Sequence, residues 1–293
     1  MPSIDVAHSP PAPCAHRGKR LCAAGIGIVL FTGGSLASPA PSIEQKPEAL
    51  RVCADPNNMP FSNQRQEGFE NTLAAMLAAY RGQRLEYVWW PQRRGFIRTT
   101  LSAGVCDVVM GIPAVLTTVL TTAPYYRSSY VFVTRRDSHL AIESFDDARL
   151  RSLIIGVHVM GNDYAVAPPG EALMARGLGS RIKGFSILGD YQQPDPPAAL
   201  ITAVAEKTVD VAVAWGPLGG YFASHSRVPL EIRLARPVAG VPLQFSIAMG
   251  VRRGNTTLQR EIDTFLVRHR VAVQRVLTEF HVPLVEEPKR SGG

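Results

Sequence analysis

The chain between residues 89 and 133 reads WWPQRRGFIRTTLSAGVCDVVMGIPAVLTTVLTTAPYYRSSYVFV and places helix and strand signals in close succession. Phe96, Ile97 and Leu101 recur at the three- and four-residue spacing of a short amphipathic helix, which Gly104 closes. The apolar run VCDVVMGI follows and is bounded by turn residues, as in strands that are buried on both faces of a parallel sheet. This stretch therefore predicts an α/β architecture.

The same alternation extends in both directions along the chain. Upstream, LRVCA predicts a first strand, residues 69–80 predict a helix and LEYVWW predicts a second strand. Right-handed crossovers then put the first strand between its two neighbours, so that the loops at the carboxyl ends face one crevice. Downstream, SLIIGVHVMG, FSIL and VDVAVAW predict a second set of strands and FSIAMGVRR a return strand. A long helix is expected from Thr256 to Phe280, with Thr256 and Gln259 as its capping box.

The amino terminus carries an export signal. Three basic residues precede LCAAGIGIVLFTGGSLA, an apolar run too short for a comfortable membrane span that ends in small residues. Residues 1–37 are therefore predicted to be a secretory signal peptide cut after Ala37, with a retained membrane anchor as the alternative. The Pro- and Ser-rich residues 38–49 are predicted to be a flexible linker.

Composition narrows the class of protein. With 293 residues, 46% hydrophobic and 19% charged, the chain is long enough for two lobes and is not dominated by disorder. Its formal charge is +7, and it remains +5 without residues 1–37, which favours acidic partners. The arginines are scattered without a nucleic-acid recognition motif, and the seven histidines lack metal-binding spacing. We expect no nucleic-acid partner, no metal site and no cofactor.

Two cysteines remain once the leader is removed. Cys53 lies on the first predicted strand and Cys106 at the start of the third, which are expected to be neighbours in the sheet. In an oxidising compartment a disulfide between them is within reach, and two buried free thiols are the alternative.

Two carboxylates at strand ends are the candidates for acid–base chemistry. Asp55 and Asp107 follow the first strand and begin the third, where a closed crevice can shift their pKa values. The more ordinary role of such residues is to accept hydrogen bonds from loop amides. Because no nucleophile elbow, P-loop or dinucleotide motif accompanies them, we do not expect an enzyme.

The quoted stretch and the upstream LRVCADPNNMPFSN resemble the MxaJ, MoxJ and XoxJ proteins, homologues of type II periplasmic solute-binding proteins that are associated with PQQ-dependent methanol dehydrogenases. The resemblance covers nearly all of residues 50–285. It implies a two-lobed type II periplasmic-binding-protein fold, each lobe a mainly parallel sheet flanked by helices, with a cleft between the lobes. Lobe 1 is expected from residues 50–135 and 245–285, lobe 2 from residues 136–244, and a tail from residues 286–293.

The implied fold turns loops and strand ends of both lobes toward the cleft. The residues expected there are Asp55, Asn57, Asn58, Phe61, Gly111, Tyr125, Tyr126, His158, Met160, Trp215 and Tyr221. Aromatic and amide groups suit a small polar ligand or a loop of a partner protein, and the alternative is that half of them pack the lobes. Amino-acid-binding members of the broader family hold an arginine upstream of the APYY-type proline and an acidic residue where VDVAVAW ends. Here Val115 and Trp215 stand in those places, which argues against an amino-acid receptor.

A second candidate surface lies at the start of the quoted stretch. Trp89, Trp90, Arg93, Arg94 and Arg98, together called the Trp–Arg patch, combine two residue types that are enriched at interface hot spots. Successive strand residues face opposite sides, so one tryptophan is expected in the core and the other beside the arginines.

The resemblance implies a periplasmic protein that assists maturation or activation of a PQQ-dependent methanol or alcohol dehydrogenase during methanol oxidation in methylotrophs. One alternative is a solute-binding protein of an ABC importer for a small ligand other than an amino acid. Another is an enzyme built on the same scaffold. No stable membrane insertion is expected after the signal peptide is cut.

Overall fold

The computed structural model describes residues 48–160, 165–187 and 191–286. The predicted signal peptide, and most of the predicted linker and tail, lie outside these residues. Within the described part of the chain, no helix has the length and apolar character needed to cross a membrane.

The first half of the described chain alternates strands and helices as the sequence predicts. Its elements are β1 (Ala49–Ala54), β2 (Asn57–Asn58), β3 (Ser62–Asn63), α1 (Phe69–Tyr80), β4 (Arg84–Trp89), α2 (Phe96–Thr99), β5 (Val108–Pro113), β6 (Leu120–Thr121) and β7 (Tyr126–Arg135). β1 lies between β4 and β5 and runs parallel to both, which confirms the predicted central place of the first strand.

The second half repeats this plan and then returns. Its elements are β8 (Ile155–Met160), β9 (Ala165–Val166), α3 (Pro168–Met174), β10 (Ile182–Ser186), α4 (Ala199–Ala205), β11 (Val211–Trp215), α5 (Gly216–Ser224), β12 (Leu230–Leu234), β13 (Gln244–Val251), α6 (Thr256–Arg268) and α7 (Arg270–Glu279). Short 3-10 helices cover Arg136–Ser138, Ala148–Ser152, Gly179–Arg181 and Pro196–Ala198. β8 lies between β10 and β11, parallel to both.

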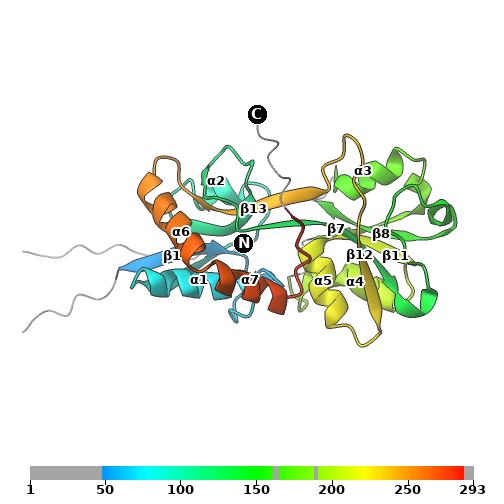
Figure 1. The fold of residues 1–293 in the computed structure, drawn as a ribbon, viewed down its shortest axis with the longest axis horizontal. Helices are drawn as coiled ribbons and strands as arrows, with labels where there is room; N and C mark the ends of the chain where they lie inside the picture. The colour runs from blue at the N-terminus through cyan, green and yellow to red at the C-terminus, as the bar shows by residue number, and fades with distance from the viewer. Residues whose placement is uncertain (1–47, 161–164, 188–190, 287–293) are drawn as a thin grey trace, which may run out of the picture. The chain divides into compact units, whose positions relative to one another are not determined.

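Two strands connect these halves into one hydrogen-bonded path. β7 pairs antiparallel with β13 through Tyr126–Ser129, and then with β11 through Tyr130–Thr134. Figure 1 shows β7 and β13 side by side, with β1 and its helices on one side and β8, β11 and β12 on the other. The architecture is thus the predicted mainly parallel α/β fold with antiparallel crossing strands. The exact lobe boundaries stay predictions.

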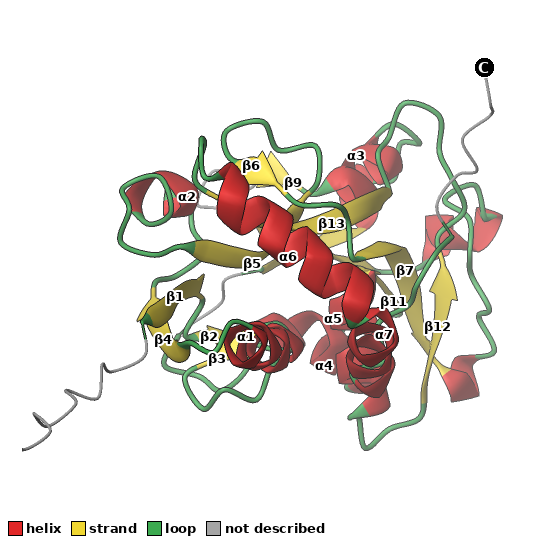
Figure 2. Ribbon diagram, turned by 60° about the vertical axis from the view of Figure 1, so that its left-hand side comes forward, coloured by secondary structure: helices red, strands yellow, loops and turns green. Residues whose placement is uncertain are grey.

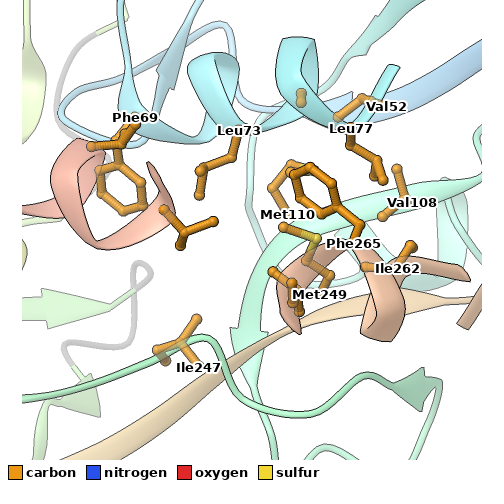
Figure 3. Packing of buried hydrophobic residues seen from close by; sticks show 14 of the residues in the cluster. Val52, Phe69, Leu73, Leu77, Val108, Met110, Ile247, Met249, Ile262 and Phe265 are labelled. Atoms are coloured by element: carbon orange, nitrogen blue, oxygen red, sulfur yellow. The ribbon is translucent and has the colours of Figure 1, made fainter. Parts of the chain in front are cut away.

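The apolar spacing of α1 builds the largest core cluster. Phe69, Leu73 and Leu77 are fully buried at helical spacing and pack toward the sheet and toward Ile262 and Phe265 of α6 (Figure 3). Separate clusters cover the two faces of β7 and β11 farther along the chain. Each half of the strand path therefore has an apolar core of its own.

The expected helix from residue 256 to residue 280 is wrong in two details. Its N-cap is Asn255, whose side-chain oxygen accepts a hydrogen bond from the backbone amide of Leu258 at 3.2 Å, because Thr256 is already helical. The helix also breaks at His269, where the backbone leaves the helical region at φ −106° and ψ 18°. Two helices, α6 and α7, therefore replace one.

A disulfide joins Cys53 of β1 to Cys106, which directly precedes β5, with the two Cα atoms 5.6 Å apart. Both cysteines are buried beside Phe96 and Leu101. The bond therefore ties the two neighbouring strands whose carboxyl ends carry the candidate site.

We expect Cys53→Ser and Cys106→Ser each to lower the free energy of unfolding, by up to about 4 kcal/mol if the effect is chain entropy in the unfolded state. The double variant should be no less stable than either single variant, because one bond is lost in all three. Urea unfolding measures this. Two free thiols titrating in the denatured, unreduced wild-type protein would contradict the bond.

Candidate functional site

The candidate site is organised around the carboxylate of Asp55, which is completely buried just after β1. It accepts hydrogen bonds from the backbone amides of Asn57 and Gln92, at 2.9 and 2.7 Å, and from the hydroxyl of Tyr191 at 2.6 Å. A buried carboxylate is tolerated only when it is hydrogen-bonded. Asp55 therefore satisfies loop amides, the ordinary alternative to an acid or base.

Residues 191–193, which come from the predicted second lobe, contact the first at this point. The side-chain amide of Asn57 donates to the carbonyls of Tyr191 and Gln193, at 3.4 and 2.9 Å. The Arg93 guanidinium lies 5.3 Å from the centre of the Tyr191 ring, a cation–π contact. Burial, and then the bond to Asp55, holds the pKa of Tyr191 well above its ordinary value, so its hydroxyl stays a donor.

Glu70 completes the site and was not predicted from the sequence. It lies in the first turn of α1 and is 5% exposed. A Cβ at Gly111 would lie 2.0 Å from its Oε1 atom, so the carboxyl group needs a glycine there. Burial, with Asp55 as a second cause, raises the pKa of Glu70 to about 8. Glu70 is therefore neutral at pH 7.

Tyr125 and Tyr126 lie close enough to Glu70 for its charge to raise the pKa values of both hydroxyl groups, after the larger effect of burial. The Tyr125 hydroxyl is buried and has no hydrogen-bond partner in the described chain. Buried carboxyl and phenol groups thus lie close to one another behind Asp55. Local sequence does not single out Glu70, because an acid in the first turn of a helix ordinarily interacts with the helix dipole.

The other predicted cleft residues mostly pack against neighbours. Phe61 contacts Phe69, Trp215 lies against Tyr130 and Phe245, and Tyr221 stacks on Phe280. Asn58 remains near Asp55, where its side-chain amide donates to Gln92 at 3.2 Å. Met160 ends β8, and its side chain lies outside the described part.

His158 is 3% exposed, and the backbone of Pro197 lies close enough to its ring to offset part of the effect of burial on its pKa. Burial lowers its pKa to about 4, so the ring is neutral at pH 7. Asp107, the other acid–base candidate, is held by Arg51, whose Nη2 atom donates to Oδ1 at 2.6 Å. Across the described ranges, His, Cys, Asp and Glu side chains do not assemble in threes as a metal site would need.

The two tryptophans of the Trp–Arg patch differ in exposure, although Trp89 is only half-buried and not a core residue as expected. Trp89 stacks on Tyr87 with ring centres 4.4 Å apart, while Trp90 is 48% exposed. Arg94 and Arg98 are exposed, and neither forms an ion pair with a described carboxylate. A hollow of about 620 Å³ adjoins them. Its lining is Gln92, Arg93, Gly95, Phe96, Ile97, Arg98, Ser102, Ile112, Pro113, Leu116 and Thr118.

The raised pKa of Glu70 makes stability depend on pH. In the folded protein Glu70 keeps a proton that it releases in the unfolded chain above its ordinary pKa of 4.5. The contribution of Glu70 to the free energy of unfolding is therefore complete below pH 4.5 and is lost as the pH rises to about 8. The free energy of unfolding of Glu70→Gln should not show this pH dependence, and near neutral pH it should exceed that of the wild type by on the order of 3 kcal/mol. Urea unfolding across the window tests it. The exposed Glu279→Gln is the control, and parallel curves for wild type and Glu70→Gln would refute the assignment.

The chain is similar in sequence to bacterial extracellular solute-binding proteins. The protein-family model "Bacterial extracellular solute-binding proteins, family 3" matches residues 50–272. The chain is 33% identical to Protein MoxJ of Methylorubrum extorquens over 259 residues, covering 82% of this chain and 83% of that protein. It is 29% identical to Protein MoxJ of Paracoccus denitrificans over 286 residues, covering 91% and 97%.

Two solved structures of periplasmic proteins are similar to this chain over most of its length. The periplasmic binding protein XoxJ from Methylobacterium extorquens AM1 aligns with a TM-score of 0.68 at 35% identity, covering 81% of this chain and all of that one. MxaJ from Methlophaga aminisulfidivorans MPT aligns with a TM-score of 0.70 at 29% identity, covering 80% of this chain and all of that one. The fold is therefore that of type II periplasmic binding proteins, and the chain belongs to family 3 of the bacterial extracellular solute-binding proteins, among homologues of MoxJ, MxaJ and XoxJ.

Proposed function

We propose that this chain is a periplasmic accessory protein, without enzymatic activity of its own, that binds a PQQ-dependent methanol or alcohol dehydrogenase and assists its maturation or activation. The observation that carries the proposal is the occupation of Asp55 by the chain's own Tyr191 hydroxyl and two backbone amides. A ligand that used this carboxylate would have to displace donors that already satisfy it.

The positions that clamp amino acids in the broader family support the same proposal. Val115 is 82% exposed and carries no charge, and Trp215 packs between aromatic rings. Neither supplies an ion pair for a carboxylate or an ammonium group. The exposed Trp–Arg patch, by contrast, offers a large aromatic side chain and unpaired positive charges to a protein surface.

The predicted export signal and the family of extracellular proteins support a periplasmic location. The relatives named MoxJ, MxaJ and XoxJ connect the proposal to methanol dehydrogenase systems through the resemblance described above. An ABC-importer receptor for a small ligand other than an amino acid is the second candidate, and the family assignment favours it.

Thermal unfolding tests whether the chain is an amino-acid receptor. No standard amino acid at millimolar concentration should raise the melting temperature, whereas a ligand at a hundred times its dissociation constant stabilises by about 2.7 kcal/mol. Clear stabilisation by any one of them would restore the receptor interpretation. The measurement uses the mature protein, with the same amino acids added to an unrelated protein as the control.

Titration against a PQQ-dependent methanol dehydrogenase tests the partner directly. We expect binding that weakens as salt rises, because exposed charges are screened over about 8 Å at physiological ionic strength. Trp90→Ala should weaken affinity, and Arg94→Glu with Arg98→Glu should slow association about tenfold, because rim charges steer encounter.

A charge-matched control is available. Arg151→Glu with Arg181→Glu changes two exposed arginines elsewhere by the same charge and should leave the association rate within about twofold. Undetectable binding to both the apo and the PQQ-loaded dehydrogenase at low salt, together with tight binding of a small solute, would overturn the proposed function.

A further inference from the structure

The segment after α7, residues 280–285, contacts both halves of the strand path and is called the C-terminal strap. The chain leaves α7 at His281, whose φ of 52° lies in the left-handed region that commonly ends a helix. Figure 1 shows this segment, in dark red, passing beside α5 toward β7, and Figure 2 shows α7 and α5 next to each other from a second direction.

One side of the strap belongs to the core around α1. Val282 is 6% exposed and is part of the same apolar cluster as Leu73 and Phe265. Phe280 packs against that cluster too, with the centre of its ring 5.9 Å from the centre of the Phe69 ring. Burial of these two apolar side chains therefore anchors the strap to the first half of the strand path.

The other side of the strap packs on α5, which belongs to a separate core formed with β7 and β11. The ring of Tyr221 on α5 stacks on Phe280, with the ring centres 5.8 Å apart. A Cβ at Gly220 would lie 2.0 Å from the carbonyl oxygen of His281 and 3.2 Å from the Cδ atom of Pro283. The glycine therefore lets the strap approach the helix at backbone distance, which a larger residue there would prevent.

The strap is also hydrogen-bonded to β7, close to the point where that strand leaves β13 and pairs with β11, after Ser129. The hydroxyl of the buried Ser128 donates to the carbonyl oxygen of Pro283 at 2.6 Å. The backbone amide of Val285 donates to the carbonyl oxygen of Arg127 at 3.0 Å. Because β7 and β13 carry the strand path between the two halves, a motion of one half relative to the other bends these strands. The strap is fixed at that bend.

We propose that the C-terminal strap clamps the hinge of this protein in the closed arrangement, in which Tyr191 reaches Asp55. A rotation about β7 and β13 that withdraws Tyr191 also turns α5 relative to α7, so it has to break the contacts of the strap on one side. The strap and the bonds to Asp55 therefore open together, as one cooperative unit. The proposal concerns how the cleft opens and holds for either candidate function.

Two substitutions loosen the strap and leave the residues around Asp55 unchanged. Ser128→Ala removes the hydroxyl that donates to Pro283. Gly220→Ala adds a Cβ where the carbonyl oxygen of His281 now lies, so the strap has to move away from α5. If the glycine variant does not fold, the serine variant decides alone.

Hydrogen exchange of the full mature chain reports on both ends of the proposed unit. The backbone amides of Asn57 and Gln92 donate to Asp55, and the amide of Val285 belongs to the strap. In the serine variant all three amides should exchange about fivefold faster than in the wild type, because the loss of one hydrogen bond shifts an opening equilibrium by roughly that factor. In the glycine variant they should exchange at least as fast.

Each variant has a matched control. Ser129→Ala removes an equally buried hydroxyl that donates to the carbonyl oxygen of Leu243 at 3.2 Å, so the strap keeps its bonds. Gly179→Ala adds a Cβ that meets Met174 at an ordinary distance of 3.9 Å. Both controls should leave the three exchange rates within about twofold of the wild type, because exchange through an opening responds to the contacts that this opening breaks.

Faster exchange at Val285 with unchanged exchange at Asn57 and Gln92 would overturn the proposal, because the strap would then open alone. Unchanged exchange at Val285 in both variants would count against it as well, since the contacts named here would not hold the segment. Equal acceleration in Ser129→Ala would mean general destabilisation in place of release of the strap. Tyr191→Phe should in turn speed exchange at Val285, because coupling between two sites is reciprocal, and an unchanged rate there would contradict the coupling.

Discussion

The burial of the Asp55 carboxylate is the constraint on which the candidate site depends. A charged group with no exposure must find donors inside the protein, and it finds three: two loop amides and a phenol. Those bonds hold the loop after β1, the segment after β4 and residues 191–193 around the Asp55 carboxylate. Because Asn57 adds two further bonds to the same segment, parts of the chain that lie more than a hundred residues apart are held together here.

This arrangement changes what a solute-binding fold can do at its cleft. A ligand ammonium group could reach Asp55 only by displacing Tyr191, and the phenol would then lose a short hydrogen bond in a partly buried place. The neighbouring Glu70 adds no charge at pH 7, since burial keeps its carboxyl group protonated. The region thus has the polar composition of a ligand site, with its strongest acceptor already used by the protein.

The sequence predicted what depends on local pattern and failed where distant segments meet. The central place of β1 and the Cys53–Cys106 bond follow from hydrophobic periodicity and chain crossovers. Tyr191 was missed because its partner Asp55 is 136 residues away, and nothing in the local sequence indicates that contact. The helix break at His269 was missed because the apolar spacing continues across it.

A protein-binding role makes physical sense of where the unpaired groups lie. Self-contacts at Asp55 order the loops around it before any partner arrives, which lowers the entropy that association would otherwise cost. Trp90 is exposed, and the exposed Arg94, Arg98, Arg268, Arg270 and Arg275 form no ion pair with a described carboxylate. Solvent screens these charges until a partner replaces it. A receptor for an ammonium ligand needs a charged acceptor that is free inside the cleft, whereas the protein's own donors already bind the Asp55 carboxylate. The bonds to Asp55 therefore hold the loops around it in place, which is compatible with the proposed binding of a partner at an outer surface.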